Sequence, residues 1–296
     1  MDALGRVAVI IGYEWRRALA KKKILALIIL AVAFQTLVMV VLSQFATRTM
    51  FLPSGVMPFM WIFGVLQGQS LFVPLIAIIT AGSSMSEEYE HGTADILLSK
   101  PITKVEYMFG KFFGGFSLLA VVELCTTFVG AILAVWFFGP QTGLQYVPLM
   151  FLAIVYSSLI FFCMSFMFSE VFRRSTIATM SAFAILFASS IISQYLASLY
   201  MMTRDYLYFH LSRGIPTWGA TYFPSLLMRE LMAMPSSFFI VGDPLISFEV
   251  ARGASEAIYV RDALLQAVMT VAVYAIIFIL IAVYRLLKSD VTKKTA

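Results

Sequence analysis

The chain has 296 residues, of which 61% are hydrophobic and only 12% are charged. A soluble domain is usually about half apolar and about a quarter charged, so the composition excludes an ordinary soluble protein and indicates an integral membrane protein. The net charge of +5 comes from Lys and Arg at the ends of apolar runs, and this placement argues against nucleic-acid binding. Two cysteines are too few for a disulfide framework or a zinc site.

Six apolar runs are long enough to cross a bilayer, because a helical span needs about 20 apolar residues. The runs are continuous and rich in Leu, Ile, Ala and Phe, which favours helices over the weakly alternating strands of a membrane barrel. We therefore predict an all-α integral membrane protein with a single transmembrane domain over residues 1–296. The predicted spans are 24–44, 61–82, 112–138, 147–169, 176–200 and 262–284.

Residues 3–23 precede the first span and carry too many charges to cross the membrane. Their apolar side chains can share one helical face while the arginines reach water or lipid headgroups. We predict an interfacial helix whose apolar face comprises Leu4, Val7, Ile11, Trp15, Ala18 and Leu19.

Two amides, Gln67 and Gln69, fall in the outer half of the second predicted span. They are candidates for lining a translocation path. Hydrogen bonds between neighbouring helices are the simpler explanation.

The connection 83–111 is longer than the other inner connections. Gly92 ends the helix that leaves the second span, and Thr93 can cap a new helix by accepting a backbone N–H. Residues 96–98 form an apolar knob, and Pro101 ends the short helix because the residue before a proline avoids the α region.

A capping box from Thr103 to Glu106 predicts the start of another helix, which continues into the third span. The connection therefore presents a short helix whose apolar knob lies beside acidic side chains. Such a shape suits docking into a groove of another protein. An ordinary surface helix lying on the membrane is the alternative.

Glu123 lies about 11 residues into the third predicted span, or roughly 16 Å along the helix axis. An acid at that depth is a functional hypothesis by default: it can line a path, bind a cation or relay protons. It can also be a neutral or hydrogen-bonded acid that holds helices together. Further along the chain, Glu170, Arg173 and Arg174 are expected in a solvated inner turn.

The stretch 201–261 mixes Tyr, Phe and Met with charges and four prolines. The segment 226–234 reads as a short amphipathic helix between two of these prolines. We predict an outer cap of short helices between spans five and six.

The positive-inside rule places the N-terminus in the cytoplasm, because most of the 21 Lys and Arg residues then lie on that side. With six spans both termini are cytoplasmic. The expected location is the plasma membrane, with a multi-pass topology. His91 and His210 are isolated in this topology, so no metal site is expected.

Three linked elements in the connection resemble the motif of type 2 ABC exporter permeases. They are Glu88-x-Glu90-x-Gly92-Thr93, Leu97-Leu98-x-x-Pro101 and Glu106-x-x-x-Gly110-Lys111. In that family the segment between the second and third spans is the coupling helix. The start, Glu14-Trp-Arg-Arg, and the end, residues 284–290, are also similar to the family.

The resemblance implies a permease that pairs with a second copy, as a homodimer or related heterodimer, and binds two copies of a separate ABC ATPase. ATP-driven alternating access would export an unidentified substrate. ATP and Mg²⁺ belong to the ATPase; this chain has no G-x-x-x-x-G-K-[ST] motif, so it is expected to bind no cofactor and to be no enzyme. The implied coupling residues are Glu88, Glu90, Gly92, Thr93, Leu97, Leu98, Pro101 and Glu106.

A competing class is a stand-alone channel or ion-coupled secondary transporter that uses Glu123. In that class the connection 83–111 would be only a structural linker. An adjacent gene for a Walker A ATPase would favour the exporter.

Overall fold

A computed structural model describes residues 3–20, 22–49, 57–93, 102–232 and 256–288. These residues contain helices and no strands, and six of the helices are long and apolar enough to cross a membrane. The all-α prediction is therefore confirmed. The six are α2 (Lys23–Thr49), α3 (Met60–Gly82), α6 (Lys104–Phe138), α7 (Val147–Phe172), α8 (Ser175–Thr203) and α12 (Glu256–Lys288).

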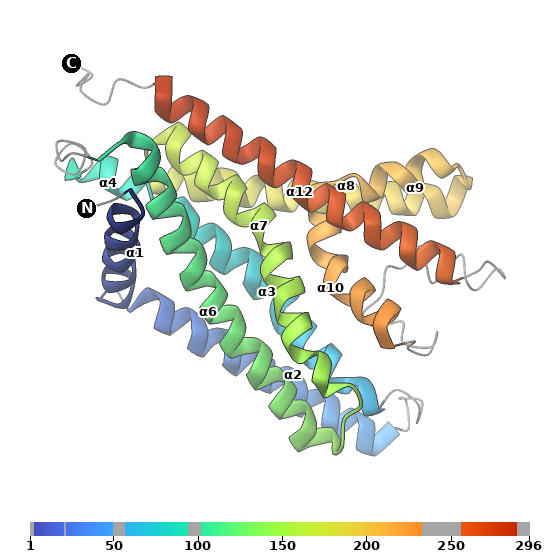
Figure 1. The fold of residues 1–296 in the computed structure, drawn as a ribbon. Coiled ribbons are helices and arrows are strands. Elements are labelled where there is room, and N and C mark those ends of the chain that lie inside the picture. The colour runs from blue at the N-terminus through green and yellow to red at the C-terminus, as the bar shows by residue number, and fades with distance from the viewer. Residues whose placement is uncertain (1–2, 21, 50–56, 94–101, 233–255, 289–296) are drawn as a thin grey trace.

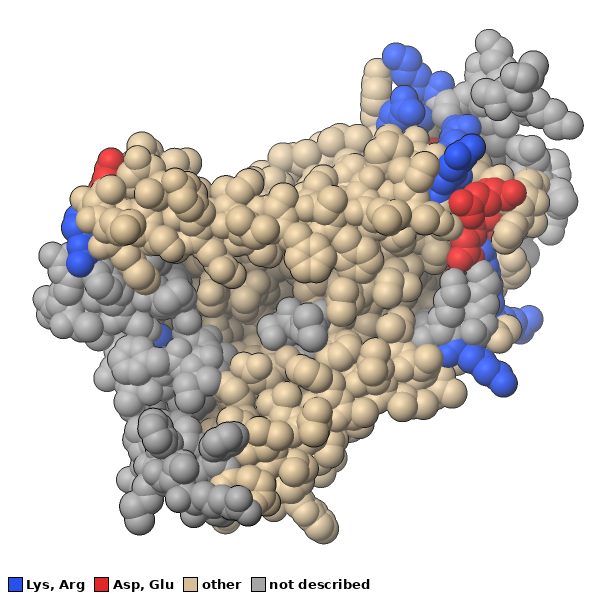
Figure 2. Space-filling model, turned by 180° about the vertical axis from the view of Figure 1, so that it is seen from behind, with Lys and Arg blue, Asp and Glu red and all other residues tan. Residues whose placement is uncertain are grey.

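Helices α3, α6 and α7 form the centre of the bundle, where α3 packs against both of the others. The apolar stretches of these three helices are half or more buried, whereas less than a third of the corresponding stretches of α2, α8 and α12 is buried. Figure 2 shows charged side chains gathered at two ends of one face, with uncharged surface between them. Charge is costly within lipid, so this distribution fits helices that cross a bilayer.

A close approach of α2, α3 and α6 depends on small residues and one amide. The side chain of Gln35 in α2 donates a hydrogen bond to the backbone oxygen of Gly64, at 2.8 Å. A Cβ at Gly130 of α6 would collide with the same Gln35 amide. The glycines therefore let the helices approach closely enough for a buried polar group to find a partner.

Short elements join the spans at the two ends of the bundle. At one end lie α1 (Ala3–Ala20) and α4 (Ser86–Glu90), and we call this the α4 end (Figure 1). At the opposite end, η1 (Met57–Phe59) precedes α3 and η2 (Leu144–Tyr146) precedes α7. The indole of Trp61 donates to the Thr142 oxygen at 2.8 Å and ties these two connections together.

Helix α1 is present where the sequence predicts it. Its buried residues are Ile10 and Glu14, whereas Leu4 and Leu19 of the apolar face predicted to meet the membrane surface are exposed. The buried face packs on α6, where any Cβ at Gly110 would clash with Ile10. Helix α1 is thus fixed to the bundle, and its contact with a membrane surface stays a prediction.

Two short helices follow α8: α9 (Tyr206–Arg213) and α10 (Pro216–Met232). Short helices were predicted in this stretch, yet α10 does not simply cover the end of the bundle. It packs between α7 and α12, and α9 runs back along α8 (Figure 1). Helix α10 begins ten residues before the predicted segment 226–234, and residues 233–234 lie outside the described part of the chain.

Polar side chains of α12 explain how the helical chain can be interrupted between α9 and α10, beside a spanning helix. Gln266 and Tyr274 donate to the backbone oxygens of His210 and Gly214, at 3.4 and 3.2 Å, and the Thr270 hydroxyl, which donates to the Gln266 backbone oxygen of its own helix at 2.8 Å, lies 3.4 Å from the Arg213 oxygen. Their spacing of four residues places them on one face of α12. Backbone groups must find partners inside a membrane, and this row of side chains supplies them between α9 and α10.

Candidate functional site

The site lies at the α4 end, where the chain leaves α3. The hydroxyl of Ser169 in α7 accepts hydrogen bonds from the backbone N–H groups of Met85 and Ser86, at 3.1 and 2.8 Å. These N–H groups have no partner within the short helix α4. Helix α7 thereby fixes the start of α4.

Consecutive residues of α4 contact four different helices. One turn of helix takes 3.6 residues, so four neighbours in sequence point in four directions. Glu87 accepts from Arg17 of α1 at 2.6 Å, Glu88 from Lys111 of α6 at 2.6 Å, and Glu90 from the Ser175 N–H of α8 at 2.8 Å. The Tyr89 hydroxyl donates to Glu170 of α7 at 3.0 Å. The five residues of α4 thus join α1 and three of the spanning helices.

Lys111 is the most buried charge of this network. Its side chain is 0% exposed, and its Nζ lies 2.5 Å from Glu14 Oε1 and 2.6 Å from Glu88 Oε1. The rings of Tyr13 and Tyr107 lie 5.5 and 5.7 Å from the ammonium group. An unpaired buried ammonium would be very unfavourable, so Lys111 requires both carboxylates.

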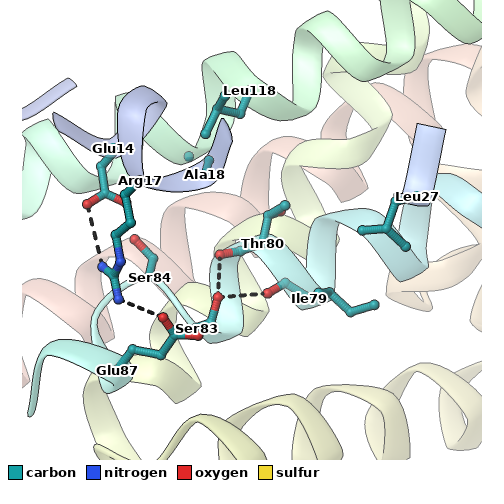
Figure 3. A pocket seen from close by; sticks show the side chains of 11 residues that line it. Glu14, Arg17, Ala18, Leu27, Ile79, Thr80, Ser83, Ser84, Glu87 and Leu118 are labelled. Atoms are coloured by element: carbon teal, nitrogen blue, oxygen red, sulfur yellow. Dashed lines mark hydrogen bonds and ion pairs between the residues drawn. The ribbon is translucent and has the colours of Figure 1, made fainter. Parts of the chain in front are cut away.

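Arg17 extends the network to a second carboxylate of α4. Its Nη1 contacts Glu88 Oε1 and its Nη2 contacts Glu87 Oε2, each at 2.6 Å. Figure 3 shows the guanidinium between Glu14 and Glu87. Burial opposes the charge of Arg17, but Glu88, Glu14 and Glu87 together hold the pKa of Arg17 above its ordinary value.

A small cavity of about 70 Å³ borders the network (Figure 3). Ala18, Leu27 and Leu118 supply apolar walls, and Ser84 contributes a buried hydroxyl. The volume is that of roughly two water molecules. The side chains between α1 and α3 therefore pack less tightly than the residues of the neighbouring ion pairs.

The sequence profile of the family described as "ABC-2 family transporter protein" matches residues 8–291. The chain belongs to the ABC-2 family of transporter proteins. A search of curated proteins finds no match. The family assigns this chain the role of a membrane transport subunit, the permease of an ABC transporter, and implies an ABC ATPase subunit as its partner.

The family motif explains part of this network. Glu88 of its first element and Lys111 of its third element form a buried ion pair. Gly92 has a φ of +68°, in the left-handed region that glycine tolerates best. The Thr93 hydroxyl donates to the backbone oxygen and the carboxylate of Glu88, so it bonds back to α4. Leu97, Leu98 and Pro101 lie outside the described residues.

Glu106 confirms the predicted capping box and makes one further contact. Thr103 Oγ1 accepts from the Glu106 N–H at 3.2 Å, and Glu106 Oε2 accepts from the Thr103 N–H at 3.0 Å. Arg6 of α1 also donates to Glu106 Oε1 at 2.6 Å, and this hydrogen bond raises the pKa of Arg6. Helix α1 is therefore tied to the first turn of α6 as well as to Lys111.

Sequence reasoning did not identify Glu14, Arg17 or Lys111 as site residues. The spacing of Glu14 and Arg17 on an amphipathic helix was the available signal, since residues three apart are neighbours on a helix. Glu170 was expected in a solvated turn, and this is wrong: its side chain is buried against Tyr89.

The residues proposed to line a translocation path, Glu123, Gln67 and Gln69, are not part of this network. Glu123 is 1% exposed in α6, and neither carboxylate oxygen accepts a hydrogen bond from a described residue. Ser158 faces it from α7, but that hydroxyl donates to the Val155 oxygen. Gln67 is half-buried in α3, and the side chain of Gln69 lies outside the described part.

Proposed function

We propose that this ABC-2 permease is the transmembrane subunit of an ATP-driven exporter, with two permease copies and two ATPase copies. The protein lies in the plasma membrane with its α4 end facing the cytoplasm. The segment 94–101 docks on the ATPase. The observation that supports this role is the set of contacts that α4, which comes just before that segment, makes with α1, α6, α7 and α8.

The docked segment lies between α4 and α6 in the chain. Its movement is therefore passed to both helices. Lys111 of α6 holds α1 and α4 through ion pairs in which its Nζ lies 2.5 Å from Glu14 Oε1 and 2.6 Å from Glu88 Oε1. Glu90 holds the first residue of α8, and Tyr89 holds α7. A displacement of α4 is thus shared by several spans instead of being absorbed by a flexible loop.

The chain's own part in transport is mechanical. ATP and Mg²⁺ bind in the partner ATPase, whose closure and opening would supply the force. Spans α6 and α7 run between the α4 end and the opposite end, and α8 runs from the α4 end toward α9 (Figure 1), so a tilt imposed at α4 changes the exposure of a path between the two permease copies. Export, rather than import, follows the family resemblance.

The test is co-purification of tagged wild-type protein and a Leu97→Asp variant in lipid nanodiscs, with mass spectrometry of the bound proteins. We expect an ABC ATPase with the wild type and its loss with the variant, because the new charge would be buried in the docking groove. A Leu287→Asp variant, at an exposed position of α12 beyond the predicted span 262–284, is the matched control and should retain the ATPase. Absence of an ATPase from the wild type, in cells that express candidate subunits, would contradict the proposal.

A further inference from the structure

A cluster of basic side chains lies at the α4 end, where the ends of three spanning helices meet. Helix α7 ends at Phe172, α8 begins at Ser175 and α12 ends at Lys288, and α7 packs against both of the others. Figure 2 shows Lys and Arg side chains gathered at this end, beside an extended uncharged surface. We call four cations at these helix ends the basic patch: Arg173, Arg174, Arg285 and Lys288.

Arg173 connects the basic patch to α4. Its φ is +54°, in the left-handed region that glycine tolerates best, so an arginine at this turn carries a conformational cost. The side chain uses this position for a contact: the guanidinium carbon lies 4.7 Å from the centre of the Tyr89 ring, within the range of a cation–π interaction. The turn between α7 and α8 thus fixes one charge of the patch against α4.

Two arginines that are distant in sequence approach the same buried carboxyl group. The charges of Arg173 and Arg285 both act on Glu170, which is 2% exposed. The Tyr89 hydroxyl already donates a hydrogen bond to this carboxyl group at 3.0 Å. Glu170 therefore brings the two sides of the patch together, but one carboxyl group cannot balance four cations.

The exposed arginines of the patch are available to bind an anion. Arg174 and Arg285 are exposed, and neither forms an ion pair or a hydrogen bond within the described part of the chain. Glu90, the neighbouring acid of α4, uses both carboxylate oxygens to accept from the N–H and the hydroxyl of Ser175. The planar guanidinium group matches phosphate oxygens with two parallel N–H donors, so a phosphate group is the anion that suits this patch.

An apolar surface begins one turn deeper on the same face of α12. Ile277, Ile281 and Arg285 follow one another at intervals of four residues, which places them on one side of the helix. Ile277 is 43% and Ile281 is 40% exposed; both lie within the predicted span 262–284, whereas Arg285 lies just beyond it. A phospholipid has the same order of groups, with its phosphate at the membrane surface and its acyl chains below.

We infer that the basic patch binds the phosphate group of an anionic phospholipid, in the leaflet at the α4 end, with an acyl chain along Ile277 and Ile281. Basic side chains next to spanning helices attract anionic lipids. Because Arg173 also stacks on Tyr89, the bound lipid holds the turn against which α4 packs. An effect of the lipid on coupling rests on the proposed function, whereas the binding site itself does not.

Binding of radiolabelled phosphatidylglycerol to the tagged protein, immobilised in detergent, tests the site. The test variant carries Arg174→Gln and Arg285→Gln. The matched control carries Arg204→Gln and Arg261→Gln, which removes the same charge from exposed arginines at the other ends of α8 and α12. Unlabelled phosphatidylcholine and inorganic phosphate serve as competitors, the first for lipid without net charge and the second for phosphate without acyl chains.

We expect the test variant to bind phosphatidylglycerol about 25-fold more weakly than the wild type, from about fivefold for each arginine removed, and the control to bind it as the wild type does. Neither competitor should displace the label at equal concentration. Displacement by inorganic phosphate would identify a soluble phosphate compound as the ligand and overturn the lipid assignment, and displacement by phosphatidylcholine would overturn the role of charge.

Unchanged binding in the test variant, or an equal loss in the control, would overturn the site. If the test variant keeps its lipid but no longer co-purifies with the ATPase, the patch is a contact of the ATPase and the inference is wrong. The lipid assay requires no ATPase, so its failure alongside successful co-purification of an ATPase with the wild type would leave the proposed function standing.

Discussion

Removal of the Lys111 charge is the sharpest test of the network at the α4 end. In a Lys111→Met variant, Glu14 loses the cation 2.5 Å from its oxygen, and Glu88 keeps Arg17 and the Thr93 hydroxyl as partners. Breaking a buried ion pair by deleting one partner costs about 3–5 kcal/mol. Since Arg17 still faces both carboxylates, we expect a loss near the lower limit, about 3 kcal/mol of unfolding free energy.

A double-mutant cycle separates this pairing from a general loss of packing. Glu14→Gln leaves Lys111 with Glu88 alone, and we expect it to cost about 2–3 kcal/mol. The double variant, Glu14→Gln with Lys111→Met, no longer buries either unpaired charge, so the two losses should not add. The expected coupling energy is about 2 kcal/mol, within the range for residues in contact.

Denaturant unfolding in detergent micelles, followed by tryptophan fluorescence, measures all four proteins. Arg6→Met is the control, because the Arg6 side chain is 30% exposed and an ion pair that reaches solvent contributes much less to stability than a buried one. Additive losses in the Lys111 cycle, with coupling below about 0.5 kcal/mol, would refute the buried triad. So would a loss for Arg6→Met as large as that for Lys111→Met.

Three further predictions follow from named contacts. Glu90→Ala removes the acceptor for the Ser175 N–H and should destabilise the protein by about 1 kcal/mol, as for a lost helix cap; transport should fall while ATPase binding, measured by co-purification, is retained. Gly110→Leu should displace α1 because its side chain would collide with Ile10; protease cleavage within α1 should then accelerate, and unchanged protection would contradict the packing described. Glu123→Gln should preserve folding and transport if the buried acid is neutral and structural, whereas Glu123→Lys should prevent assembly; loss of transport in well-folded Glu123→Gln would revive the ion-coupled alternative.

The spans could be predicted from the sequence because a helix that crosses lipid must be apolar over about 20 consecutive residues. Local chemistry was also readable: the capping box at Thr103 and Glu106 is present, and Gly92 has a positive φ. Both features depend on residues at most a few positions apart, so no knowledge of the tertiary structure was needed.

The candidate site was only partly predictable, since its energetics depend on residues far apart in the chain. Lys111 and Glu14 are separated by 97 positions, and no local sequence pattern predicts that they form an ion pair. Lys111 and Glu14 stood in separate elements of the family resemblance, which did not pair them. Gly110 and Gly114, which admit α1 to that surface, carry no charge signal.

The position of α10 escaped prediction for a related reason. Gln266, Thr270 and Tyr274 appear in the sequence as single polar residues within an apolar run. Their common role emerges only when the end of α9 lies beside them. Prolines and charges in the stretch indicated short helices, but they gave no measure of depth.

The central claim, that α4 passes movement of the ATPase to the spans, can be measured directly by electron paramagnetic resonance. Spin labels at Met202→Cys, near the end of α8 remote from α4 in a cysteine-free background, report the distance between two permease copies in nanodiscs with the ATPase bound. We predict that trapping the ATPase with ATP and vanadate shifts this distance in the parent protein, and that Glu90→Ala or Lys111→Met abolishes the shift while the ATPase stays bound. The same shift in these variants as in the parent would contradict the account.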